Sequence, residues 1–214
     1  MKKIATAVGL VLLAGPGLAQ GLTVYDGAKL EFTQDEDGPG TGTNSYLSGY
    51  VEAEFGGIYA GIWGRAASDD LLDEYDLYLG YRNELASGLS YDFSYTRYYY
   101  PNDGGNCCGE YLLSLGKPFG DALSGTLDIY HDPEADLSSI YLGGAYAVTD
   151  ALELSANWGT YEVDSAGNEQ EWDLGATYTL GAETAADLRY YDGSDYAGSY
   201  WGLSLTWDST LFGG

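Results

Sequence analysis

The residues best suited to covalent chemistry are one histidine and two serines that follow it. His131 is the only histidine of the chain, and Ser138 and Ser139 lie across the next predicted loop. A lipid hydrolase on the surface of a membrane barrel needs a serine, a histidine base and a polar group that orients the histidine. The sequence allows a contact between histidine and serine but specifies no third group. We therefore interpret His131 as an exposed loop residue and predict no enzyme activity.

Metal chemistry has equally few candidates. A zinc site needs several His or Cys ligands, and this chain offers one histidine and the adjacent pair Cys107-Cys108. Cα atoms of adjacent residues are only about 3.8 Å apart, so this pair cannot link distant segments. The sequence leaves two interpretations of the pair open: two free thiols, or a bond between them that closes a small local ring. The loop acids Asp35, Glu36 and Asp37 lack the spacing of an EF-hand loop, and we expect no metal and no cofactor.

The strongest chemical pattern is a set of acidic side chains at every second position of many segments. Thirteen acidic residues share this parity with only four basic ones. A surface of this kind attracts cations and repels anions. The set comprises Glu31, Glu52, Glu54, Glu74, Asp76, Glu84, Asp92, Glu110, Asp128, Glu153, Glu171, Asp173 and Asp187, with the bases Lys29, Arg65, Arg82 and Arg189.

The first nineteen residues predict export. Lys2 and Lys3 precede a short apolar run, and small residues surround a cleavage point after Ala19, as in a secretory signal peptide; an uncleaved anchor is the alternative. Without the signal, six basic residues face 33 acidic ones, a net charge of −27. This balance excludes nucleic acid and anionic lipid surfaces as partners. We predict one domain over residues 20–214.

The elements that position the charges are predicted to be strands, because period-2 alternation recurs between turn signals and no window has a helical period. Short connections alternate with longer polar ones, which is typical of an outer-membrane barrel. The sequence therefore predicts an all-β fold, a transmembrane antiparallel up-and-down β-barrel of about 12 strands. The expected strands are 22–33, 43–55, 57–66, 73–85, 88–100, 109–117, 123–131, 137–148, 150–163, 169–180, 184–192 and 199–208. Phe212 lies past the last range, and the final strand either ends before it or extends to it.

The alternate positions of these strands, those that do not carry the acidic residues, are apolar in the middle and aromatic near both ends. Leucine, alanine and glycine predominate between the two aromatic sets, and no charge lies in that middle band. A lipid-facing belt between two interfacial girdles has this composition, because a tyrosine buries its ring while its hydroxyl reaches the headgroups. The girdle candidates are Tyr75, Tyr81, Tyr91, Tyr99, Tyr111, Tyr146, Trp158, Trp172, Tyr178, Tyr190, Trp201 and Trp207. In such a barrel the charged parity lines the lumen, with the candidates Glu52, Glu54, Asp76, Arg82, Asp92, Glu110, Asp128, Asp173, Asp187 and Arg189.

Part of the chain also resembles a known family. The stretches FGGIYAGIWGRA (55–66), DEYDLYLGYRNELASGLSYDFSYTRYYYP (73–101) and CGEYLLSLGKPF (108–119) resemble the TorF family of porins, a Gcw-type conserved bacterial outer-membrane family. The resemblance covers about residues 47–119. It implies an outer-membrane β-barrel of a Gram-negative bacterium, and it brings no catalytic residues.

Together these patterns predict a porin for passive diffusion of small solutes with a preference for cations, in contact with outer-membrane lipid. Two alternatives stay open: a plugged, structural or adhesive barrel, and a soluble secreted β-sandwich. Inward arginines such as Arg82 and Arg189 favour the first alternative if they pair with carboxylates and close the lumen. The sequence specifies neither the solute nor the oligomeric state.

Overall fold

The computed structural model describes residues 21–35, 43–68, 73–163, 167–194 and 198–213. The predicted signal peptide, residues 1–19, lies outside the described residues, as do 36–42, 69–72, 164–166 and 195–197 within the predicted long loops. Among the described residues there is no helix long and apolar enough to cross a bilayer.

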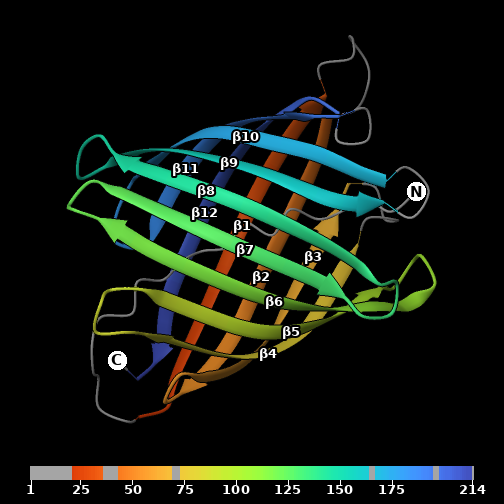
Figure 1. Cartoon of the computed structure of the whole chain (residues 1–214), viewed down its shortest axis with the longest axis horizontal. Coiled ribbons are helices and arrows are strands. Elements are labelled where there is room, and N and C mark those ends of the chain that lie inside the picture. The colour runs from red at the N-terminus through yellow and green to blue at the C-terminus, as the bar shows by residue number, and fades with distance from the viewer. Residues whose placement is uncertain (1–20, 36–42, 69–72, 164–166, 195–197, 214) are drawn as a thin grey trace.

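Twelve strands form one sheet that closes on itself, as the sequence predicts (Figure 1). Every strand pairs antiparallel with its neighbours in the chain, and β12 returns to pair with β1. The described strands therefore form a closed up-and-down barrel and not the two packed sheets of a sandwich. Their bounds are β1 Thr23–Asp35, β2 Thr43–Phe55, β3 Ile58–Ala67, β4 Glu74–Glu84, β5 Ser90–Tyr100, β6 Gly105–Phe119, β7 Leu123–Asp132, β8 Leu137–Ala147, β9 Leu152–Val163, β10 Gly167–Thr179, β11 Thr184–Gly193 and β12 Tyr200–Phe212.

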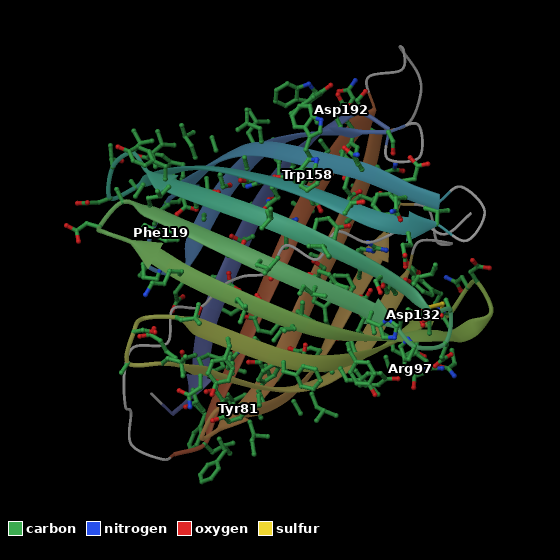
Figure 2. All side chains as sticks on the ribbon, in the orientation of Figure 1. Tyr81, Arg97, Phe119, Asp132, Trp158 and Asp192 are labelled. Carbon is green, nitrogen blue, oxygen red and sulfur yellow. A yellow bond between two sulfur atoms is a disulfide. The ribbon has the colours of Figure 1, made fainter. Side chains whose placement is uncertain are left out.

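The connections differ at the two ends of the barrel. Phe119, beside the short turn between β6 and β7, lies at one end in Figure 2, whereas Arg97 and Asp132 lie at the other. Gly56 and Gly57 connect β2 to β3 with φ values of 61° and 87°. A two-residue hairpin turn with positive φ at both positions matches the twist of the flanking strands and is open mainly to glycine. We call the two ends the short-turn end and the long-loop end.

Two strands extend well beyond a predicted end. β6 begins at Gly105, not at 109, because β5 and β6 stay paired past an irregularity between Arg97 and Tyr99. Cys107 and Cys108, which we expected in a loop, therefore lie on β6, and they form a disulfide with each other. Of the two interpretations that the sequence left open, free thiols or a local ring, the structure therefore has the local ring.

The last strand extends to Phe212, the longer of the two alternatives. It does so because β12 closes the barrel against β1, where Phe212 pairs with Val24 beyond a register shift between Val24 and Tyr25. Pairing between the first and last strands exists only in the closed barrel. Local sequence patterns around 199–208 therefore carry no information on where β12 ends.

The barrel buries charge and exposes hydrocarbon, the reverse of a soluble domain. Asp173 and Arg189 are both 6% exposed, whereas the aliphatic residues Leu79 and Leu142 are 58% and 52% exposed. The exposed set belongs to the parity predicted to face outward. We call the two sides of the closed sheet the inner wall and the outer surface.

Candidate functional site

Two arginines on the inner wall each form ion pairs with two carboxylates. Arg82 on β4 contacts two residues of β2: its Nη2 atom lies 2.5 Å from Glu52 Oε1, and its Nε atom lies 2.8 Å from Glu54 Oε2. The Arg82 guanidinium also lies 4.5 Å from the centre of the Tyr59 ring. Both carboxylates belong to a strand that is not adjacent to β4, so Arg82 reaches across β3.

The second arginine cluster lies on β9 to β11. Arg189 on β11 forms an ion pair with Asp173 and another with Asp187, whose Oδ2 lies 3.2 Å from its Nη2. Its Nη2 atom also donates to Ser155 Oγ at 2.7 Å. A Cβ atom at Gly175 would lie 2.5 Å from Arg189 Cζ, so this guanidinium packs against a glycine of β10.

The two remaining basic residues of the predicted set are also paired. Arg65 Nη2 lies 2.7 Å from Glu74 Oε2, and Lys29 Nζ lies 3.0 Å from Glu31 Oε1. Each of the four bases thus has one or two carboxylate partners. Since thirteen acids share this parity, most of the negative charge on the inner wall is not cancelled by a cation.

Tyrosines satisfy many of these acids. Hydroxyl groups on the inner wall donate hydrogen bonds to carboxylates on other strands over 2.6 to 3.0 Å. A phenol donor stabilises a carboxylate without cancelling its charge. The pairs are Tyr50 with Asp208, Tyr59 with Asp92, Tyr98 with Glu110, Tyr100 with Glu74 and Tyr141 with Glu171.

The parity of β5 predicts Tyr98 and Tyr100 on the lumen wall, but sequence reasoning did not identify the inner tyrosines as donors to the carboxylates. The available signal was their parity: Tyr98 and Tyr100, for example, alternate with the outward residues of β5. Several pack against glycines of the next strand. A Cβ atom at Gly159 would lie 2.1 Å from Tyr141 Cδ1, and one at Gly80 would lie 2.5 Å from Tyr59 Cζ. Glycine thus provides the space in which each ring lies against the wall.

The ten predicted lumen residues all belong to the less exposed parity of their strands. Glu52, Asp76, Asp173 and Arg189 are buried, and the others are half-buried. The structure brings together Arg82 with Glu52 and Glu54, and Arg189 with Asp173 and Asp187. Asp92 lies opposite Arg82 in the β4–β5 register and accepts a hydrogen bond from Tyr59. Glu110 and Asp128 form no ion pair with either arginine among the described residues.

The predicted girdle residues lie on the outer surface at both ends of the strands. Near the long-loop end they contact one another, with ring centres 5.2 Å apart for Tyr75 and Tyr99 and 5.0 Å apart for Tyr190 and Trp201. Near the short-turn end Tyr81 and Tyr91 are 6.1 Å apart. The remaining members, Tyr111, Tyr146, Trp158, Trp172, Tyr178 and Trp207, are each exposed by 38% or more.

Arg97 is the one basic residue that interrupts the outward face of β5. Its Nε atom donates to Asn106 Oδ1 at 2.7 Å, and its guanidinium pairs with Glu134. Both partners lie at the long-loop end, so the arginine extends away from the apolar belt, as a snorkelling cation does. Figure 2 shows Arg97 near Asp132 at that end.

His131 lies half-buried on β7 and not in an exposed loop, because β7 extends to Asp132. The structure brings it together with one of the two serines considered for hydrolysis. His131 Nδ1 lies 3.2 Å from Ser138 Oγ across the β7–β8 pair. The backbone amide of Ser138, a natural oxyanion donor, instead donates to Glu162 Oε2 at 2.8 Å. A carboxylate beside the serine destabilises the oxyanion of acyl transfer, so this contact lacks an essential part of a hydrolytic site. Among the described residues no group of three or more His, Cys, Asp or Glu side chains is placed to hold a metal ion.

Comparison with known proteins identifies the fold. No protein-family model and no curated protein sequence matches the chain. Among solved structures it is similar to the KdgM porin, with a TM-score of 0.66 and 10% identity over 85% of this chain and 98% of that one. It is also similar to the NanC porin (TM-score 0.64, 8% identity, 87% of this chain and 100% of that one) and to an outer membrane channel from Pseudomonas putida F1 (0.55, 12%, 91% and 97%).

These similarities define a class of fold, the closed barrel of outer-membrane porins and channels. At such low identity they show the fold alone. Membership of the TorF family stays a prediction, because none of these comparisons confirms it.

Proposed function

We propose that this chain is an outer-membrane channel for passive diffusion of small solutes and that it prefers cations. The observation that carries the proposal is the way in which the inner carboxylates are held. Five of them accept hydrogen bonds from tyrosines, and the four bases are shared among a minority of the acids. The wall therefore keeps its negative charge while its carboxylates stay in place. A water-filled pore with such a wall concentrates cations and excludes anions.

The charge of the wall also separates this chain from one of its structural neighbours. One similar structure is described as the KdgM porin in complex with disordered oligogalacturonate. Galacturonate units carry carboxylates, and a carboxylate solute meets like charge along the inner wall of this barrel. We infer that the same fold serves solutes of opposite charge here.

Reconstitution in planar lipid bilayers tests the proposal. With a KCl gradient across the membrane, the purified mature protein should conduct, and the reversal potential should have the sign of K⁺ selectivity. Absence of conductance would favour a plugged or structural barrel in which the clusters around Arg82 and Arg189 close the lumen. Anion selectivity would overturn the cation preference.

A matched pair of variants tests the role of the wall. Replacement of Glu110 by Gln together with Asp128 by Asn removes two inner charges, and the reversal potential should move toward zero. Replacement of Glu162 by Gln removes a charge from the outer surface and should leave the reversal potential unchanged. An equal effect of both changes would mean that the inner wall does not set the selectivity.

Location is tested separately by membrane fractionation and gel migration. The mature protein should fractionate with the outer membrane and migrate differently when unheated than when boiled, as closed barrels do. N-terminal sequencing should begin at Gln20 if the signal peptide is cleaved after Ala19. Recovery of soluble protein from the periplasm would contradict the membrane location.

A further inference from the structure

One carboxylate of the inner wall is buried without a hydrogen-bond donor at one of its oxygens. Asp76 on β4 is 8% exposed, and its Oδ1 atom has no hydrogen-bond partner among the described residues. Removal of a carboxylate from water without compensation costs several kcal/mol, so a group of this kind normally has a cationic or hydrogen-bonding partner.

The donors around this carboxylate are committed to other groups. Arg65 pairs with one oxygen of Glu74 at 2.7 Å, and Tyr100 donates to the other at 3.0 Å. Tyr98 donates to Glu110 at 2.8 Å. The charged groups that act on the unpaired carboxylate are Glu74, which is repulsive, and Arg65, which is attractive but already shared. Two carboxylates, Glu74 and Asp76, therefore share one nearby cation, Arg65, in this part of the wall.

Aromatic residues flank Asp76 on both sides. In the strand register it lies directly opposite Trp63 on β3 and opposite Tyr98 on β5. Residues paired in this way have Cβ atoms about 4.5–5.5 Å apart. The next inward residue of β4 is Tyr78, whose ring packs where a Cβ atom of Gly61 would lie. Asp76 thus has an aromatic residue opposite it on each neighbouring strand, and the Trp63 ring already attracts one cation, the Arg65 guanidinium 5.8 Å from its centre.

The chemistry of this group favours an organic cation over a metal ion. The described residues hold no cluster of three or more ligands for a metal. An ammonium group needs only one counter-ion, and aromatic faces attract it through their quadrupoles. Asp76 is the third residue of β4, which begins at the long-loop end, so a solute that enters there would meet it early.

We propose that Asp76, Trp63, Tyr78 and Tyr98 form a binding site for an organic ammonium ion just inside the long-loop end of the barrel. The site deepens the proposed function and rests on it, because a solute reaches these residues from the long-loop mouth of the lumen. If the site binds as proposed, amines and quaternary ammonium compounds are the class of solute that the channel selects.

Calorimetric titration of the purified mature barrel in detergent tests the site, with choline as the probe. Its neutral analogue, 3,3-dimethyl-1-butanol, has the same shape without the charge. Choline should bind saturably, and the analogue should bind at least about tenfold more weakly. Equal binding of the two probes would overturn the proposal without any variant.

Two matched variants locate the site. Asp76→Asn should weaken choline binding by about tenfold or more, whereas Asp92→Asn, which changes a carboxylate already bonded to Tyr59, should leave it within about twofold. Equal losses in the two variants would indicate attraction by the whole lumen and would overturn the proposal. Trp63→Leu should weaken binding about two- to fivefold, and Trp63→Phe, which keeps a ring, should weaken it less.

The site and the channel can fail separately. Cation-selective conductance without choline binding would overturn the site and leave the channel standing. Choline binding without conductance would overturn the open channel, while the proposed site at Asp76 would remain.

Discussion

The two faces of β5 use the same residue type for opposite purposes. Tyr91 and Tyr99 on its outer face contact other tyrosines of the outer surface, Tyr81 and Tyr75, through their rings. Tyr98 on its inner face donates its hydroxyl to a carboxylate of β6. Outside, these tyrosines meet through their rings. Inside, the hydroxyl donates a hydrogen bond to a carboxylate, and the ring covers the wall. The environment of each face, not the residue type, decides what a tyrosine does.

The largest expected effect comes from a charge placed on the outer face. Phe93→Arg puts a cation in the apolar belt, which costs about 2–4 kcal/mol at the bilayer centre. Most of the protein should then fail to show the folded, heat-modifiable band after refolding into lipid vesicles. Thr96→Arg on the inner face is the control, because it places the cation opposite Glu110 and should fold normally. Equal tolerance at both positions would reverse the assignment of faces.

A smaller effect is expected where a ring lies against glycine. Gly159→Val overlaps the Tyr141 ring and should lower the free energy of unfolding by about 1–3 kcal/mol in urea titrations. Gly144→Val is the control, because its Cβ position is 3.8 Å from the nearest atom, a backbone oxygen. Tyr141→Ala in the same chain should restore part of the loss. A Gly144→Val variant as unstable as Gly159→Val would mean that the inner ring packing is not the cause.

The smallest effect compares one hydroxyl group on each face. Tyr59→Phe deprives Asp92 of a donor at 2.6 Å and should cost about 0.5–1.5 kcal/mol of unfolding free energy. Tyr178→Phe changes a residue that is 52% exposed on the outer surface and should cost less than about 0.5 kcal/mol. A double change of Tyr59→Phe with Asp92→Asn should cost less than the sum of the two single changes, which measures the coupling of the pair. Equal costs for Tyr59→Phe and Tyr178→Phe would contradict the difference between the faces.

The sequence by itself determined the class of fold and the two faces of each strand. Period-2 alternation is a local property, so the parity that carries Asp92 and the parity that carries Phe93 are legible without any partner strand. The number of strands and the alternation of short and long connections followed from turn residues for the same reason.

Only the tertiary structure decided which inner residues meet. Arg82 contacts Glu54 across an intervening strand, and Tyr141 reaches Glu171 from two strands away. These contacts depend on register and closure, as does the pairing of Val24 with Phe212. Asp76 and Asp92 are the same residue type at the same parity, yet one oxygen of Asp76 lacks a donor while Asp92 is bonded to Tyr59. Local sequence does not distinguish them, because their partners come from other strands that only the closed barrel places beside them.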